Sequence, residues 1–145
     1  PHAHARIDAI DTSTALARPG VVAVYTAADL GDYWRPGPVI VPPPPVAGSV
    51  FNERTQVPLA KDKARHVGEP VAIVIAESRY LAEDAAGDVV VEWAPLPVAA
   101  DLERAAAADA PRVHDDVPGN LAAHVHQRKG DYAAAAKRAH RIIRR

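Results

Sequence analysis

Apolar residues occur along the chain in short runs or in alternation with polar residues, the spacing of β-strands rather than of long helices. Gly, Pro and Asp residues, which favour turns, separate these stretches. The pattern predicts strands over residues 3–10, 21–26, 64–67, 71–76, 88–93, 121–126 and 140–144. The most apolar run, residues 71–76, is Val-Ala-Ile-Val-Ile-Ala, and we expect it to form a central strand buried on both faces.

Short helical segments lie between these strands. They are predicted over residues 15–17, 27–30, 79–87, 101–108 and 132–138. Ser78, Asp101 and Asp131 stand at the starts of the last three, where a side-chain oxygen can accept a hydrogen bond from a free backbone N–H. The helix over 79–87 follows one strand and precedes another, so we expect it to pack across one face of a sheet. Parallel and antiparallel pairing of the two flanking strands both remain open.

One stretch has a different composition. Residues 31–55 contain repeated Gly and Pro residues, including four consecutive prolines at 42–45, and predict a long surface loop. A plain connector is the favoured interpretation of this loop. A loop that faces a ligand or a partner is the alternative.

Composition narrows the class of protein. The chain has 145 residues, 17 Lys and Arg against 18 Asp and Glu, and 48% hydrophobic residues, which indicates a folded domain without a dedicated nucleic-acid surface. The absence of Cys excludes disulfides, thiolate metal sites and a thiol nucleophile. No apolar run approaches the length of a membrane span, and no signal peptide opens the chain, so we expect a cytoplasmic protein. Met is also absent, and both ends have strand-like sequences, so we expect a piece of a longer polypeptide.

Histidines are the first candidates for chemistry. His2 and His4, and likewise His124 and His126, are two residues apart, a spacing that places both rings on one face of a strand. Such pairs are compatible with metal binding, but a site needs a third ligand, and no carboxylate accompanies either pair as in established zinc motifs. Half-exposed polar positions of strands are therefore the favoured interpretation.

The remaining polar residues match no catalytic motif. The serines do not lie in a Gly-x-Ser-x-Gly elbow, and Ser13 and Ser78 are better explained as helix caps. Glu53, Glu69 and Glu77 are interpreted as solvated or turn residues rather than as acids or bases. No glycine-rich phosphate loop is present. We therefore assign no catalytic, cofactor-binding or metal-binding residue to this chain.

Several segments, taken in order, resemble one protein family. The segments are residues 1–7, 11–13, 19–24, 28–30, 67–72, 82–86, 91–98, 118–121, 130–131 and 135–140. Together they resemble the N-terminal α/β-hammerhead domain of the molybdenum hydroxylase large subunit, the family of xanthine dehydrogenase, aldehyde oxidase and aerobic carbon monoxide dehydrogenase. The resemblance implies an α+β fold, with a mixed sheet and short helices packed on it. It implies one domain over residues 1–145, with the Pro-rich loop at about 31–55 and a C-terminal extension from about 111. Family members usually have a strand or two before the first segment, so we expect an exposed sheet edge here.

The resemblance also implies a chemistry for the parent subunit. The parent would carry molybdopterin, in the cytosine dinucleotide form, and would oxidise its substrate with oxygen from water. Electrons would leave through iron–sulfur and FAD subunits. The molybdenum site would be built by domains that follow this one, so no cofactor is expected in this chain. Gly68-Glu69-Pro70 superficially resembles the family's catalytic glutamate signature, but its place at the start of a predicted buried strand favours a turn.

The favoured hypothesis is that the chain is a scaffold domain without activity of its own. Two further hypotheses accompany it. The first is a stand-alone binding or assembly module of a split enzyme. The second, which is weaker, is a metal-binding protein that uses the histidine pairs. The favoured hypothesis expects contacts with the remaining domains of the large subunit and with the iron–sulfur and FAD subunits, and neither nucleic-acid binding nor a membrane span. It assigns the prolines at 42–45 to a surface that meets another domain, because a stiff extended loop loses little entropy on docking.

Overall fold

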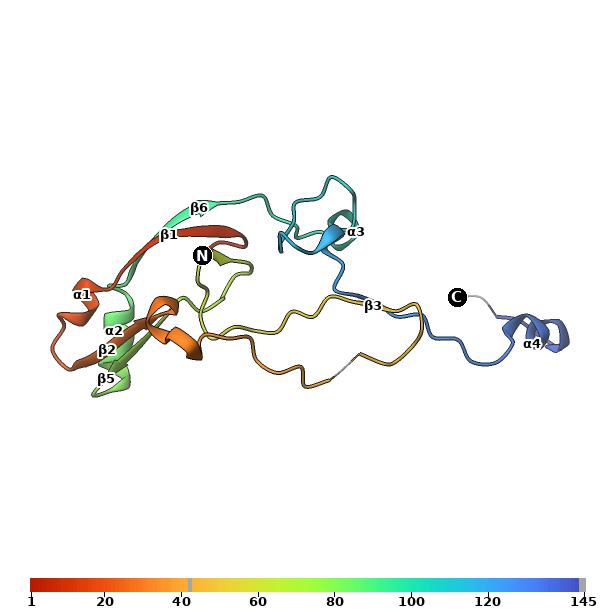
Figure 1. The fold of residues 1–145 in the computed structure, drawn as a ribbon, viewed down its shortest axis with the longest axis horizontal. Coiled ribbons are helices and arrows are strands. Elements are labelled where there is room, and N and C mark those ends of the chain that lie inside the picture. The colour runs from red at the N-terminus through yellow and green to blue at the C-terminus, as the bar shows by residue number, and fades with distance from the viewer. Residues whose placement is uncertain (42, 144–145) are drawn as a thin grey trace.

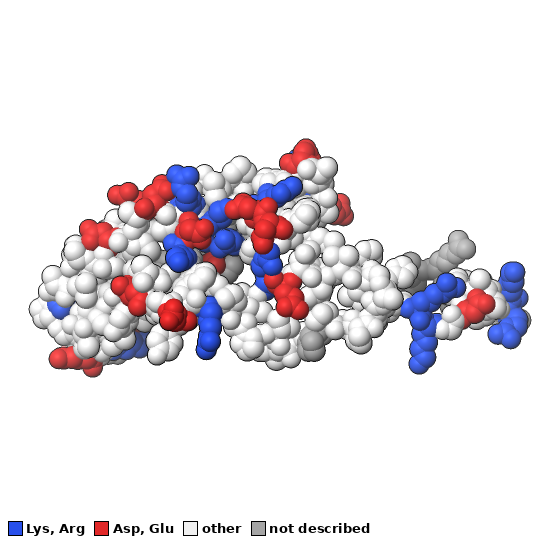
Figure 2. Space-filling view, in the orientation of Figure 1, with Lys and Arg blue, Asp and Glu red and all other residues white. Residues whose placement is uncertain are grey.

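The computed structural model describes residues 1–41 and 43–143. Its strands form small antiparallel sheets. Most of the strands lie toward one end of an elongated molecule, and helix α4 (Tyr132–Arg138) lies at the other end (Figure 1). Short helices pack on these sheets, which confirms the predicted α+β class. The charged side chains of both signs are interspersed over the middle of the molecule, while basic side chains dominate the end that carries α4 (Figure 2).

The first sheet joins distant parts of the chain. Strand β1 (Ala5–Asp11) lies between β4 (Lys63–Ala64) and β6 (Val90–Pro95). Both pairings are antiparallel, and Ala5 lies opposite Ala64 on one side and Pro95 on the other. The strand register of β1 and β6 shifts between Ile7 and Ala9, which marks a β-bulge. Residues near the N-terminus are thereby tied to segments about sixty and ninety positions later.

The second sheet carries the main core. Strand β2 (Val21–Thr26) pairs with β5 (Ala72–Ala76), and helices α1 (Ser13–Leu16) and α2 (Arg79–Ala86) pack against it. The buried cluster and its neighbours are small or β-branched residues: Ala15, Val21, Val24, Ala72, Val74, Ala85 and Val89. Helix α2 begins where predicted, because Ser78 Oγ accepts a hydrogen bond from the Leu81 backbone N–H at 3.3 Å.

The prediction of a central strand over residues 71–76 is wrong. Strand β5 has β2 as its only partner among the described strands, and Ile73 and Ile75 are 45% and 44% exposed. A continuous apolar run indicates that both faces need cover, but it does not show which elements supply that cover. The strands that flank α2 lie in different sheets, so neither the parallel nor the antiparallel pairing left open for them occurs.

The elongated part of the molecule contains short elements. Helix η1 (Ala27–Tyr33) is a 3₁₀ segment, and strand β3 (Val50–Phe51) pairs antiparallel with β7 (Ala123–His124). Helix α3 (Leu102–Ala105) and the 3₁₀ turn η2 (Pro118–Asn120) lie between the first sheet and β7. Strand β3 therefore interrupts the loop predicted over 31–55. The 3₁₀ segment η1 extends into the first three residues of that loop, and apart from β3 its other described residues, which do not include Pro42, form no helix or strand.

Several predicted bounds were too long. Of the strand predicted over 64–67, the structure forms only the short strand β4, and of the strand predicted over 121–126 it forms only β7. The helix predicted over 101–108 is shortened to α3. Residues 140–143 form no strand, and residue 144 lies outside the described residues. Strands of this kind need a partner to satisfy their backbone groups, and local alternation does not reveal whether one is present. Helix α4, in contrast, has the predicted bounds, and Asp131 caps it through a 3.0 Å bond from the Ala134 N–H.

Candidate functional site

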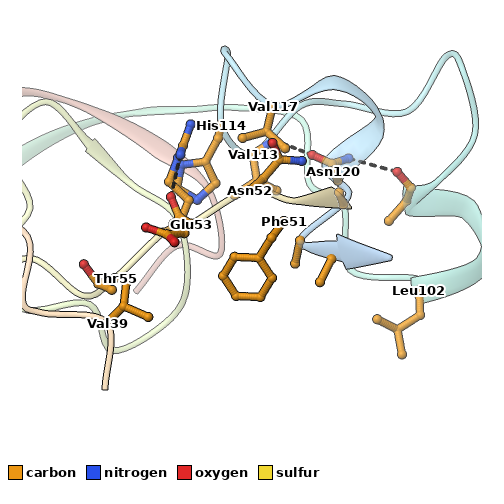
Figure 3. Close-up of a pocket in the computed structure, with 15 residues that line it drawn as sticks. Val39, Phe51, Asn52, Glu53, Thr55, Leu102, Val113, His114, Val117 and Asn120 are labelled. Carbon is orange, nitrogen blue, oxygen red and sulfur yellow. Dashed lines mark hydrogen bonds between the residues drawn. The ribbon is translucent and has the colours of Figure 1, made fainter. Parts of the chain in front are cut away.

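The candidate site is an apolar pocket of about 450 Å³ beside the β3–β7 ladder (Figure 3). Three stretches enclose it: residues 51–55, the α3 region from 99 to 105, and residues 113–123. Most of its lining side chains are apolar, with Val39, Phe51, Leu102, Val113 and Val117 the largest of them. Such a lining suits an apolar group rather than a charged ligand.

Asn120 holds one wall of this pocket. Its Oδ1 accepts a hydrogen bond from the Val113 N–H at 2.9 Å, and its Nδ2 donates to the carbonyl oxygens of Ala105 and Pro111, both at 2.9 Å. The residue has a φ of 52°, in the left-handed region where Asn is one of the few tolerated side chains. One side chain thus connects α3, the loop at 111–113 and η2.

The short β3–β7 ladder forms another part of the lining. The Asn52 N–H donates to the Ala122 carbonyl oxygen at 2.9 Å, and Asn52 Nδ2 donates to the Leu121 carbonyl oxygen at 2.7 Å. These bonds extend the two-residue pairing and hold Phe51 against the pocket (Figure 3). The ring of Phe51 remains 41% exposed, so the pocket is open to its surroundings.

A second hollow, of about 860 Å³, adjoins the first and is charged. Glu53, Arg54 and His114 belong to both linings, and Arg65 and Asp116 belong to the second. Arg54 forms an ion pair with Asp116, and this bond lowers the pKa of the Asp116 carboxyl group. The charge of Arg54 in this hollow is thus engaged by a carboxylate.

His114 lies where the two hollows meet. Burial is the largest cause of its lowered pKa, and the positive charges of Arg65 and Arg54 add to it, against the opposing effects of Asp116 and Glu69. The imidazole is therefore held in its neutral form over a wider pH range than in an unfolded chain. His114, Phe51 and Asn120 were not singled out as site residues from the sequence, and the Gly119-Asn120 turn signal was the only local hint.

The structure gives the predicted histidine pairs separate places. His4 is 5% exposed, with Nδ1 2.7 Å from the Pro97 carbonyl oxygen, and His2 lies against Trp93 with ring centroids 5.5 Å apart. His124 and His126 lie beside the β3–β7 ladder, their ring centroids 6.2 Å apart. Within residues 1–41 and 43–143, no group of three or more His, Asp or Glu side chains is arranged to hold a metal ion.

The serines and glutamates have local roles or none. Ser78 caps α2 as predicted, but the prediction that Ser13 is a helix cap is wrong. Ser13 is the first residue of α1, no side chain caps that helix, and the Ser13 N–H donates to Asp11 Oδ1 at 2.9 Å. Ser49 Oγ is buried without a hydrogen-bond partner among the described residues. Glu69 accepts the Arg65 N–H at 2.5 Å next to Gly68, whose φ is +88°, so this segment forms the expected turn. Glu53 lines both hollows and Glu77 is exposed.

Comparison with known proteins defines the family to which the chain is similar. Residues 1–97 match the family described as the a/b hammerhead domain of aldehyde oxidase and xanthine dehydrogenase. The carbon monoxide dehydrogenase large chain of Afipia carboxidovorans is 43% identical over 120 residues, which are 83% of this chain and 14% of that protein. The nicotine 6-hydroxylase large subunit of Paenarthrobacter nicotinovorans is 37% identical over 143 residues, 99% of this chain and 17% of that protein.

Solved structures agree with this comparison. Quinoline 2-oxidoreductase from Pseudomonas putida 86 superposes with a TM-score of 0.72 at 41% identity, covering 84% of this chain and 15% of that one. The chain belongs to the aldehyde oxidase and xanthine dehydrogenase family, as the α/β-hammerhead domain of its large subunits. It spans about a seventh of the length of the relatives named above.

The residues of this chain do not fit the molybdopterin that the family implies. A pterin with a phosphate chain needs many donors and unpaired positive charge. The apolar pocket offers few donors, and its Asn120 amide is already bonded at both atoms. The second hollow contains Arg54 and Arg65, but Glu53, Asp62, Glu69 and Asp116 also line it and would repel phosphate.

Proposed function

We propose that this chain is a structural domain of a molybdenum-dependent oxidoreductase large subunit and has no turnover of its own. The observation that carries the proposal is the match to the hammerhead family over residues 1–97, in relatives about six times as long as this chain. Chemistry in such a subunit would take place in other domains.

The core of the domain also favours a place within a larger body. Leu59 is the one large side chain that is fully buried among the described residues, and most other core members are alanines. Large apolar side chains such as Val22, Ile40 and Leu102 are 67%, 89% and 91% exposed. Burial of apolar area is the main stabilising contribution in folding, so cover from neighbouring domains would add to the stability of this one.

We also propose the composition of the parent enzyme. Its large subunit would carry molybdopterin in the cytosine dinucleotide form, and iron–sulfur and FAD subunits would accept the electrons. The names of relatives as a large chain and a large subunit support an assembly of several chains. Within the described residues no helix is long and apolar enough to cross a bilayer. We propose the cytoplasm as the location.

The Pro-rich loop is the proposed contact with another domain. Ile40 and Val41, which directly precede the four prolines, are 89% and 79% exposed. Exposed aliphatic side chains on a stiff backbone can dock with a small entropic cost. A deletion of residues 40–45 in the full-length subunit should therefore weaken assembly, while a deletion of the exposed residues 127–129 serves as a control for shortening the chain.

The experiment that tests the proposal is purification of the natural gene product with an antibody against this segment. A denaturing gel should show a band several times larger than 15.4 kDa, with two smaller partner chains. A band near 15.4 kDa would instead support the stand-alone module. Turnover of an aldehyde or a purine by the isolated chain, without added subunits, would contradict the scaffold role.

A further inference from the structure

The β2–β5 sheet has one covered face and one open face. Val24 and Val74 lie opposite each other in the register and face the helices α1 and α2. Because side chains alternate along a strand, the neighbouring pairs Tyr25 with Ile73 and Ala23 with Ile75 lie on the other face. We call these four residues the outer face.

The outer face is apolar and partly exposed. Tyr25, Ile73 and Ile75 are 42%, 45% and 44% exposed, and the face contains no charged side chain. The sheet has no further described strand on either edge. A two-stranded sheet with one open apolar face is marginal in water, and β5 has the sequence of a strand that is buried on both sides.

We propose that the outer face is a docking surface for the remaining polypeptide of the same large subunit, an inference that rests on the proposed function. The relatives contain about six times as much chain outside this region as within it, since this chain spans 14% of the carbon monoxide dehydrogenase large chain. An aliphatic segment of that polypeptide fits the face, because a charged or polar segment would lose hydration without gaining a partner.

The size of the outer face argues against a second copy of this chain as the occupant. Three half-exposed side chains offer on the order of 300 Å², whereas a stable complex buries about 800 Å² on each partner. A contact within one polypeptide does not lose the translational and rotational freedom of a free partner, so a small apolar patch suffices there.

Hydroxyl-radical footprinting of the purified full-length gene product tests this proposal. Tyr25 is the probe, and Tyr80 and Tyr33 are internal references, since they are 81% and 84% exposed in this domain. Each oxidation rate is divided by the rate of the same tyrosine in the urea-unfolded protein. From the exposed fractions alone, Tyr25 should be oxidised at about half the normalised rate of Tyr80. If the outer face is covered, the normalised rate of Tyr25 should be several-fold lower than that.

Two variants of the full-length protein sharpen the result. Ile75→Thr should weaken the docking and raise the oxidation of Tyr25, while Val90→Thr, a change at a 58% exposed strand residue outside the outer face, should not. A Tyr25 rate near half that of Tyr80 in the unsubstituted protein would overturn the proposal. So would protection that disappears on dilution, because that result indicates a second copy.

The failure of this inference and that of the proposed function are distinguishable. A gene product near 15.4 kDa contradicts both, because no covering polypeptide then exists. A long product that contains molybdenum, with Tyr25 freely oxidised, contradicts the docking surface alone.

Discussion

His4 Nδ1 lies 2.7 Å from the carbonyl oxygen of Pro97, a residue 93 positions later in the chain. The Leu96 N–H donates to the His4 carbonyl oxygen at 3.0 Å, so the two segments are joined twice. Because a carbonyl oxygen only accepts hydrogen bonds, Nδ1 carries the proton. The buried Nε2 atom has no partner among the described residues. His4 is thus a buried residue that ties the N-terminal segment to the segment after β6.

Replacing His4 should destabilise the chain. His4→Ala removes one buried hydrogen bond and leaves a cavity, so the free energy of unfolding should fall by about 2–3 kcal/mol. His4→Asn places an amide N–H near the position of Nδ1 and should lose less than half of that. Urea unfolding followed by circular dichroism measures both. Equal losses in the two variants would show that the bond to Pro97 contributes little.

Asn120 should be the most sensitive residue of the apolar pocket. Asn120→Ala removes three side-chain hydrogen bonds and places Ala at a φ of 52°, so we expect a loss of about 2–4 kcal/mol. Glycine adopts that φ without strain, so Asn120→Gly loses only the hydrogen bonds. The difference between the two variants then gives the cost of the backbone strain. Asn52→Ala, which removes one exposed bond, is the matched control and should cost about 1 kcal/mol or less. If all three variants unfold at the same urea concentration, Asn120 does not hold the pocket.

Two glycines separate steric crowding from backbone conformation. Gly20 and Gly48 both have a φ of +80°, but a Cβ on Gly20 would lie 2.6 Å from Leu81 Cδ1, while one on Gly48 would meet nothing within 4 Å. Gly48→Ala should therefore cost about 1 kcal/mol from strain alone. Gly20→Ala should cost about 2–4 kcal/mol because it also pushes on Leu81 of α2. Thermal and urea unfolding measure both, and equal costs would mean that Leu81 moves aside freely.

The pH dependence of stability should include a contribution from His114. Its folded-state pKa lies below the ordinary value of 6.5, mainly because of burial, so the unfolded chain takes up the proton first as pH falls. The free energy of unfolding should therefore decrease as pH is lowered from about 6.5 toward the folded-state pKa. His114→Gln should reduce this slope, and His126→Gln, a change at an exposed residue, serves as the control. An unchanged slope in His114→Gln would contradict the assignment.

The helix starts were predictable from the sequence because their chemistry is local. Ser78, Asp101 and Asp131 each accept a backbone N–H three residues later, and the type of residue alone indicates this role. The strand positions around Val24 and Val91 were likewise indicated by short apolar runs. Propensity and capping act over a few residues, so one stretch of sequence contains the whole signal.

The pairing of strands and the candidate site were not predictable in the same way. β5 pairs with β2 across some fifty residues, and nothing in its own sequence indicates that it has a single partner. The bonds of Asn120 reach back to Ala105, and that of His4 reaches forward to Pro97. These contacts depend on how the chain returns to itself, which is decided by burial over the whole fold rather than by local pattern.

The molybdenum content of the natural gene product decides whether this domain belongs to a molybdenum-dependent oxidoreductase. The product is purified through this segment from its host, and molybdenum is measured by mass spectrometry against the amount of large chain. We expect about one molybdenum atom for each large chain, as a single cofactor in a subunit that contains this domain requires. A pure, folded product without molybdenum would contradict the assignment of this chain to a molybdenum-dependent oxidoreductase.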